Sequence, residues 1–229
     1  MQMRNLIKEK IAANGYAVGV FVASSSATNC EILAMNGYDF AVIDCEHAQT
    51  DSETAVNMFR ACEMYGMAPM VRVYNPYDGP MMSRLLDVGA HGIMVPLVND
   101  GAQAKNIVDS TKYAPVGRRG ANGGRGPRWG AYDDYVKVCN DNTLTFVQCE
   151  SIEGVNNIEE IAALPGVDGV FIGTGDLSLE MGIKFKADSS ANHTVDSPEM
   201  VAAIDKILQA CLKNGKIPGI VTASAEDTA

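Results

Sequence analysis

Short apolar runs alternate along this chain with longer segments in which apolar residues recur every three or four positions. The repeating segments have helical period and lie at residues 52–65, 79–88, 100–112, 154–163 and 199–214. Strand, helix, strand repeated in this way predicts a parallel sheet, and so many units favour a TIM-type (β/α) barrel over a doubly wound sheet. We predict seven strands in a single domain covering residues 1–229, and they are residues 17–23, 39–44, 69–74, 92–97, 144–150, 168–173 and 217–222.

Two long polar stretches interrupt the alternation. Residues 113–143 contain the Gly- and Arg-rich stretch RRGANGGRGPRW, and residues 183–197 are also polar. Loops of this length are commonly lids or disordered segments. The first stretch follows a helix and not a strand, so it is no dinucleotide fingerprint, and it lacks the aromatic repeats of an RNA-binding RGG segment.

The charge balance narrows the class of partner. The chain carries 18 basic and 28 acidic side chains, for a net charge of -10, which repels phosphate backbones and anionic lipid. No apolar stretch approaches the roughly 20 residues of a membrane span. The start MQMRNLIKEK reads as an amphipathic helix, not a signal peptide. We therefore expect a cytoplasmic protein that binds neither nucleic acid nor membrane, and we expect its six scattered cysteines to be reduced.

Polar side chains gather where the predicted strands end, which in a parallel barrel is the catalytic face. Strand alternation places Arg72 on one face with Met70 and Tyr74, and Gln148 on one face with Glu150. An arginine and a carboxylate inside a barrel are costly unless they have partners, although a structural salt bridge or a helix cap would also satisfy them. The residues at these ends are Asp44, Glu46, His47, Arg72, Gln148, Glu150 and Asp176.

This set suits a hard divalent ion more than zinc. Two carboxylates with few histidines and no clustered cysteines match the oxygen ligands of Mg²⁺ or Mn²⁺. The only histidines are His47, His91 and His193. His91 precedes the fourth strand on the opposite face, so we expect a structural or surface role for it, and the same for His193.

Several motifs occur in the order typical of one enzyme family. They include VIDCEHA, MVRV, LLDVG, YAPVGRRG, VQCE and GVDGVFIGTGDLS, and the match runs from about residue 4 to residue 223. In these motifs the chain resembles the HpcH/HpaI aldolases, metal-dependent pyruvate aldolases that act on 4-hydroxy-2-oxo acids such as 4-hydroxy-2-oxoheptanedioate.

The resemblance implies a role for each matching residue. Glu150 and Asp176 would hold a divalent ion, Mg²⁺, Mn²⁺ or Co²⁺, and Gln148, Asp176 and the Gly175 backbone would contact the substrate. His47 would be the base, Asp87 would raise its basicity, and Asp44 would support the site from behind. Arg72 would bind the substrate and stabilise the charge that develops on it. Glu46 receives no primary role.

The chemistry agrees with these roles. A 2-oxo acid can chelate a metal through its carboxylate and keto oxygens, and cleavage between C3 and C4 leaves an enolate whose charge an ion and a guanidinium stabilise. A histidine suits proton transfer from the C4 hydroxyl near neutral pH. A lysine Schiff base is disfavoured, because no lysine lies at a predicted strand end.

Two alternatives and one structural expectation remain. The loop arginines Arg118, Arg119, Arg125 and Arg128 could serve an acyl-CoA ester lyase of the same scaffold, and a non-catalytic protein that binds 2-oxo acids would also retain the barrel. The resemblance implies pyruvate and an aldehyde as small-molecule partners and a homo-oligomer, commonly a hexamer. It also implies an eighth strand and a last helix that this sequence lacks, so we predict a gap bordered by residues 17–23 and 217–222.

Overall fold

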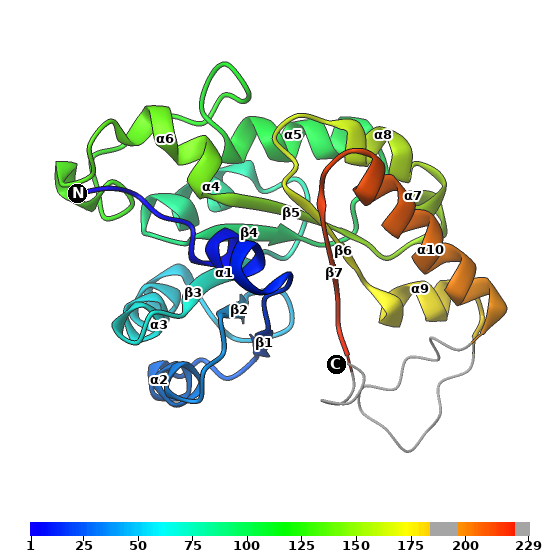
Figure 1. The fold of residues 1–229 in the computed structure, drawn as a ribbon, viewed down its shortest axis with the longest axis horizontal. Coiled ribbons are helices and arrows are strands. Elements are labelled where there is room, and N and C mark those ends of the chain that lie inside the picture. The colour runs from blue at the N-terminus through cyan, green and yellow to red at the C-terminus, as the bar shows by residue number, and fades with distance from the viewer. Residues whose placement is uncertain (184–196, 223–229) are drawn as a thin grey trace.

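A curled sheet of seven parallel strands forms the centre of the molecule (Figure 1). The computed structural model describes residues 1–183 and 197–222. The strands pair strictly in chain order, from β1 to β7. All seven predicted strands are present, and this confirms an α/β fold of the TIM-barrel type. Their bounds are β1 Gly19–Val22, β2 Phe40–Asp44, β3 Ala68–Arg72, β4 Gly92–Val95, β5 Leu144–Cys149, β6 Gly169–Ile172 and β7 Ile217–Ile220.

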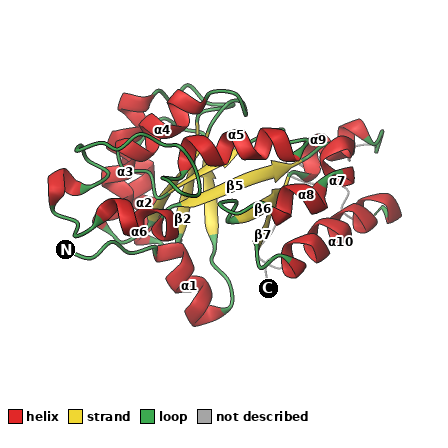
Figure 2. Ribbon diagram, turned by 90° about the horizontal axis from the view of Figure 1, so that it is seen from above, coloured by secondary structure: helices red, strands yellow, loops and turns green. Residues whose placement is uncertain are grey.

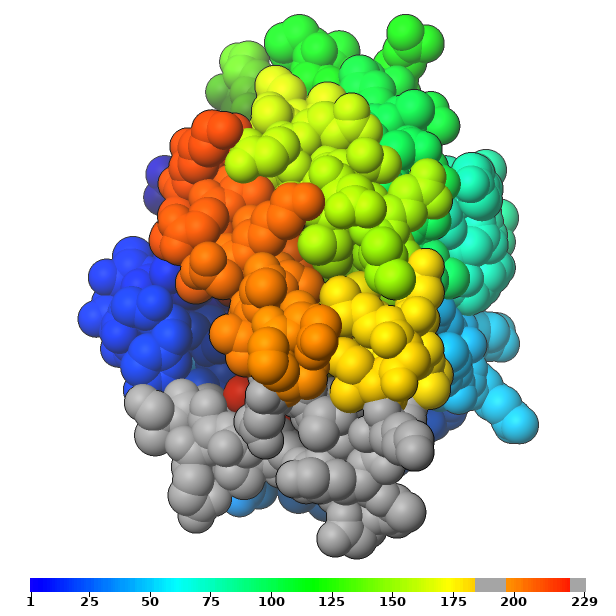
Figure 3. Space-filling view, turned by 90° about the vertical axis from the view of Figure 1, so that its right-hand side faces the viewer, coloured from blue at the N-terminus to red at the C-terminus, as the bar shows by residue number. Residues whose placement is uncertain are grey.

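Helices between the strands cover the outer face of the sheet (Figure 2). Most begin at a side chain that accepts a hydrogen bond from the first turn, such as Asp51 for α3, Asp100 for α5 and Ser197 for α10. On one side of the molecule α10 packs against α7 and α8 (Figure 3). The helices are α1 Leu6–Asn14, α2 Ala27–Met35, α3 Ser52–Met64, α4 Gly79–Asp87, α5 Gly101–Thr111, α6 Tyr135–Asn142, α7 Ile152–Asn156, α8 Ile158–Ala163, α9 Thr174–Glu180 and α10 Pro198–Lys213, with the short 3-10 helix η1 at Arg128–Gly130.

The apolar core has two main parts, one on each face of the sheet. The larger lies between the strands and the surrounding helices and includes Ile43, Phe59 and Ile107. The smaller lies inside the curl of the strands, where Met94 and Phe146 pack with Ile7 of α1. Helix α1 therefore closes the end of the sheet where the strands begin, and this leaves the carboxyl ends of the strands for chemistry.

Two predictions about local structure need correction, and one helix was not predicted. The helix predicted at 154–163 is two helices, because the chain leaves helical geometry at Asn157, whose side chain donates to the Asn99 carbonyl. Residues 113–143 are not simply a loop, since they contain α6 and η1. Helix α2 escaped prediction because it buries Cys30 and Ala34 while Ile32 and Met35 are exposed, and apolar residues on both faces erase the helical period.

Strands β1 and β7 stand at the two borders of the sheet, and each pairs with one neighbour among the described residues. In the described part of the chain β1 and β7 do not pair with each other, as the predicted gap requires.

All six cysteines are free, five of them buried, as expected. Within residues 1–183 and 197–222, none of the helices has the length and apolarity required to traverse a lipid bilayer.

Candidate active site

The candidate site lies where strands β2, β3, β5 and β6 end. Asp44 is the last residue of β2 and sits directly opposite Arg72, the last residue of β3. Gln148 lies in β5 and Glu150 follows it, while Asp176 lies in the first turn of α9, just after β6. The parallel register therefore brings residues far apart in sequence to one edge of the sheet.

Arg72 is held by two carboxylates. Its Nε and Nη2 atoms donate to the two oxygens of Asp44 at 3.0 and 2.7 Å, and its Nη1 lies 3.1 Å from Oε2 of Glu46. The guanidinium carbon is also 5.0 Å from the centre of the Phe21 ring. Burial opposes the charge of Arg72, but the two carboxylates outweigh it and raise the pKa of Arg72. The guanidinium is therefore charged and fixed in orientation.

Asp44 also shapes the turn that carries the next residues. Its Oδ1 accepts hydrogen bonds from the backbone amides of Glu46 and His47, at 3.0 and 3.4 Å. Burial alone would raise the pKa of Asp44, but the hydrogen bonds from Arg72 and these amides lower it. Asp44 is thus an ionised, buried anchor for Arg72 and for the turn that carries Glu46 and His47, and its support of catalysis stays a prediction.

Glu46 connects Arg72 to His47. Its Oε2 atom, besides contacting Arg72, lies 3.5 Å from Nε2 of His47. The Glu46 side chain is 13% exposed, whereas that of His47 is 65% exposed. Burial and the nearby charges of Asp44 and Asp176 raise the pKa of Glu46, against the opposing effects of Arg72 and His47. Glu46, to which the family resemblance gives no primary role, therefore contacts both Arg72 and His47, the two expected catalytic residues.

Glu150 is buried, with 4% of its surface exposed, and each of its oxygens has one partner. Oε1 accepts from the backbone amide of Leu97 at 2.7 Å, and Oε2 accepts from Nε2 of Gln148 at 3.0 Å. Burial raises the pKa of Glu150 to about 7, with further increases from Asp176 and Glu46 that the Leu97 amide and Arg72 only partly offset. Three carboxylates thus concentrate negative charge around this position.

Two backbone features hold Glu150 in place. Leu97 has φ 54, a left-handed conformation that is uncommon outside glycine, and this directs its amide at Oε1. Gly173 lies so close that a Cβ atom there would stand 2.3 Å from Oε2 and 2.4 Å from Cβ of Glu150. The carboxylate therefore occupies space that only a glycine at position 173 leaves open.

These residues fit a divalent cation, although within the described ranges no three His, Cys, Asp or Glu side chains form a ready-made metal cluster. Mg²⁺ is usually bound through one or two carboxylates, with water and substrate oxygens completing its shell. Glu150 and Asp176 supply two carboxylates, and the Oε1 atom of Gln148 is buried without a hydrogen-bond partner in the described structure. A cation would stabilise the ionised form of Glu150 against the burial and the neighbouring carboxylates that raise its pKa.

Asp87 lies apart from His47 within this chain. It ends helix α4, and its Oδ1 accepts hydrogen bonds from Arg119, at 2.7 Å, and from Asn122. The Arg119 side chain is fully buried, so this ion pair fixes the Gly- and Arg-rich segment against α4. The expected effect of Asp87 on His47 thus has no direct contact in the single chain, and it stays a prediction.

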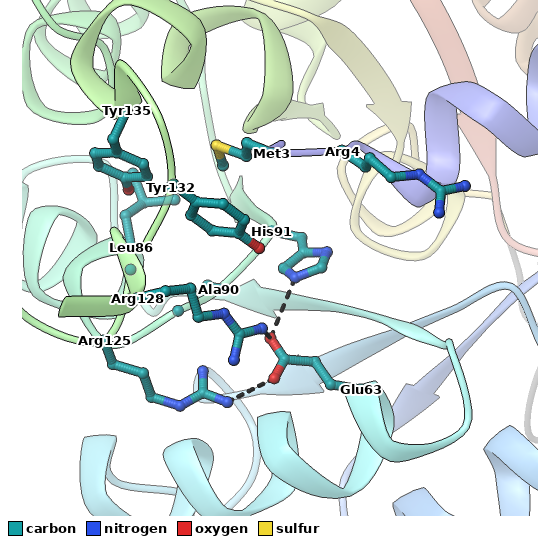
Figure 4. A pocket seen from close by; sticks show the side chains of 12 residues that line it. Met3, Arg4, Glu63, Leu86, Ala90, His91, Arg125, Arg128, Tyr132 and Tyr135 are labelled. Carbon is teal, nitrogen blue, oxygen red and sulfur yellow. Dashed lines mark hydrogen bonds and ion pairs between the residues drawn. The ribbon is translucent and has the colours of Figure 1, made fainter. Parts of the chain in front are cut away.

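His91 joins a separate ionic cluster beside the start of β4 (Figure 4). Its Nε2 lies 3.3 Å from Glu63, and the same carboxylate accepts from Arg125 at 2.6 Å and from Arg128 at 2.8 Å. Burial would raise the pKa of Glu63, but His91 and the two arginines lower it to about 2. This placement agrees with the structural role expected for His91, while His193 lies outside the described residues.

The fold and the site together define a TIM-barrel-type enzyme whose acids and single arginine meet at the strand ends. The family model of the HpcH/HpaI aldolase/citrate lyases matches residues 17–229, and the chain belongs to that family. It is a carbon–carbon lyase.

Named relatives and solved structures are similar to this chain in sequence and in fold. The chain is 38% identical to the hydroxypyruvate/pyruvate aldolase of Chromohalobacter salexigens, across 91% of this chain and 80% of the relative. It is 35% identical to the 4-hydroxy-2-oxo-heptane-1,7-dioate aldolase of Escherichia coli, across 98% of this chain and 83% of the relative. The HpcH/HpaI aldolase structure from Desulfitobacterium hafniense superposes with a TM-score of 0.87 at 28% identity, covering 98% of this chain and 84% of that one. The structure of the citrate synthase SbnG superposes with a TM-score of 0.83 at 30% identity, covering 98% of this chain and 85% of that one.

Proposed function

We propose that this protein is a divalent-metal-dependent aldolase that cleaves, or forms, the C3–C4 bond of 4-hydroxy-2-oxo acids through the enolate of pyruvate. The observation that carries the proposal is the placement of a rigidly held guanidinium, Arg72, in the same strand-end cluster as the buried carboxylate Glu150. The aldolase names of two relatives above 30% identity support the same reaction class.

Glu150 and Asp176 are the residues that we propose hold the ion. When bound, the ion would act as a Lewis acid on the 2-oxo group and offset the enolate charge. The free Oε1 of Gln148 can accept a hydrogen bond from the substrate or its bound water, and Gly175 lies one residue before Asp176 to offer its backbone amide.

Arg72 is suited to stabilise the enolate oxygen. A guanidinium has five N–H groups. Asp44 accepts hydrogen bonds from two of them, on Nε and Nη2, and Glu46 forms an ion pair beside Nη1, so N–H groups of both terminal nitrogens can still donate to a substrate. Because Asp44 fixes the plane of the guanidinium, these donors are oriented before the substrate arrives, and such preorganisation is a main source of electrostatic catalysis.

His47 is the proposed base for the proton of the C4 hydroxyl. Its side chain is 65% exposed, so it can reach a substrate that enters from solvent. Asp44 fixes the turn that carries His47, because its Oδ1 accepts a hydrogen bond from the backbone amide of His47. Replacement of His47 by alanine should therefore slow cleavage and leave metal affinity largely intact, whereas loss of the metal would make His47 a ligand.

The test is an assay for pyruvate release from a panel of 4-hydroxy-2-oxo acids, with and without Mg²⁺, Mn²⁺ or Co²⁺. We expect chelation to abolish turnover and added ion to restore it. Full activity in the presence of chelator, or trapping of the substrate on the protein by borohydride, would refute the proposal. Tight pyruvate binding without turnover of any substrate would instead favour the non-catalytic binding protein.

The acyl-CoA ester lyase receives no support from the arginine-rich segment. Arg119 pairs with Asp87, and Arg125 and Arg128 both pair with Glu63. The exposed Arg118 lies 3.8 Å from Asp109, so all four arginines have an acidic partner within the protein. A cytoplasmic location, on the sequence composition, and a homo-oligomer, on the family resemblance, remain parts of our proposal. Sedimentation of the purified chain tests the assembly.

A further inference from the structure

We propose that Glu46 is a positioning residue that holds His47 and Arg72 in their working orientations. The inference rests on the proposed function, since it concerns the base and the guanidinium of that reaction.

One oxygen atom makes both contacts. Oε2 of Glu46 lies 3.1 Å from Nη1 of Arg72 and 3.5 Å from Nε2 of His47. The backbone amide of Glu46 donates to Asp44, which also holds the other side of the guanidinium. The three side chains of Asp44, Arg72 and Glu46 therefore form a closed arrangement from which His47 extends toward solvent.

A purely structural salt bridge does not account for Glu46. Asp44 already pairs with Arg72 through two hydrogen bonds, and this neutralises the guanidinium. A second carboxylate, only 13% exposed, adds a desolvation cost without a further unpaired cation among the described contacts. The exposed ring of His47, in contrast, has no other side-chain partner in the described part of the chain, so Glu46 supplies its restraint.

The position of Glu46 predicts opposite effects on binding and turnover. Its charge competes with the anionic substrate for Arg72, because both occupy the same guanidinium. Its contact with His47 orients the base, and misplacement of a catalytic group reduces the rate. Removal of the charge should therefore tighten pyruvate binding while slowing turnover, a combination that loss of folding does not produce.

Three variants of the full chain, saturated with Mn²⁺, separate these effects. Glu46→Gln keeps the size and removes the charge, and Glu46→Asp keeps the charge and shortens the reach. Glu53→Gln removes the same charge from an exposed position in the first turn of α3 and serves as the control. Pyruvate affinity is measured by calorimetry, kcat and KM by pyruvate release, and folding by thermal unfolding.

We expect Glu46→Gln to lower kcat by roughly tenfold or more and to bind pyruvate more tightly than the wild type. Glu46→Asp keeps a negative charge near Arg72 at a greater distance, so its pyruvate affinity should lie between those of the wild type and Glu46→Gln. Its kcat should be low, because the shorter side chain does not reach His47. Glu53→Gln should match the wild type in kcat and in pyruvate affinity. In a His47→Ala background, Glu46→Gln should lower kcat no further.

Two results would overturn the inference: independent, multiplying effects of Glu46→Gln and His47→Ala on kcat, or weaker pyruvate binding together with a lower melting temperature in Glu46→Gln. Failure of the wild type to release pyruvate from any substrate would sink the proposed function instead. In that case the pyruvate affinities of the Glu46 variants, which need no turnover, still decide whether Glu46 restrains Arg72.

Discussion

Replacement of Gly173 by alanine tests whether the position of Glu150 controls the site. The new Cβ would stand 2.3 Å from Oε2 and 2.4 Å from Cβ of Glu150. Carbon atoms in favourable contact are about 3.5–4.0 Å apart, so each approach is short by more than about 1 Å. Rotation can move Oε2, but Cβ is attached to the backbone directly after β5.

The backbone around this contact has little freedom. Gly173 donates its amide to the Cys149 carbonyl at 3.1 Å, and Cys149 is in register with Ile172 of the neighbouring strand. Relief of the clash must therefore move Glu150 away from its partners Leu97 and Gln148. Overpacking of this kind costs about 1–3 kcal/mol, equivalent to roughly 2–12 °C in melting temperature for a chain of this size.

The functional loss should exceed the loss of stability. A misplacement of about 1 Å in a catalytic group can reduce the rate by about 10²-fold. We expect Gly173→Ala to bind Mn²⁺ more weakly, as measured by calorimetry, and to release pyruvate about 10²-fold more slowly at a temperature where it remains folded.

Gly123→Ala is the matched control. Gly123 lies in the Gly- and Arg-rich segment with open space where its Cβ would be, and it has no left-handed backbone to strain. This variant should keep wild-type metal affinity and turnover. If Gly173→Ala behaves like Gly123→Ala in both assays, the close contact does not position Glu150 and the reasoning is wrong.

Three further predictions concern other parts of the chain. Arg72→Lys should lower kcat by roughly 10²-fold or more with Mn²⁺ affinity unchanged, because an ammonium cannot reproduce the planar fork; near-normal kcat in pyruvate release would contradict this. Leu97→Gly should keep Mn²⁺ affinity, since glycine adopts the left-handed backbone freely, whereas Leu97→Val should weaken it in calorimetry; equal affinities would show that the Leu97 backbone is unimportant. The pKa of Glu63 is lowered from 4.5 to about 2, so its ion pairs contribute stability above pH 4.5 that disappears as the pH falls toward 2. Between pH 5 and pH 2 the free energy of unfolding, measured with denaturant, should therefore fall by up to about 3 kcal/mol more in the wild type than in Glu63→Gln. Equal losses in the two proteins would refute the assignment.

The sequence alone determined the order of the strands and most of the site. The five inner strands, β2 to β6, are largely buried apolar runs, as in residues 40–44 and 144–149, so a local pattern suffices to reveal them. Because a parallel barrel directs all strand ends to one edge, Arg72, Glu150 and Asp176 could be assigned to a common site before their distances were known. The caps of α3 and α10, Asp51 and Ser197, are likewise local, because each accepts from a backbone amide three residues further on.

Only the tertiary structure decided which of these groups touch. The pairing of Arg72 with Asp44 joins residues 28 positions apart, and that of the Leu97 amide with Glu150 joins residues 53 apart. Glu46 gained a role because the neighbouring strand delivers Arg72 beside it, and Asp87 acquired Arg119 as its partner because α4 ends against the arginine-rich segment. Hydrophobic periodicity reports which face of an element is buried, but a hydrogen bond depends on side-chain positions to within a few tenths of an ångström, and those follow only from how the strands are packed together.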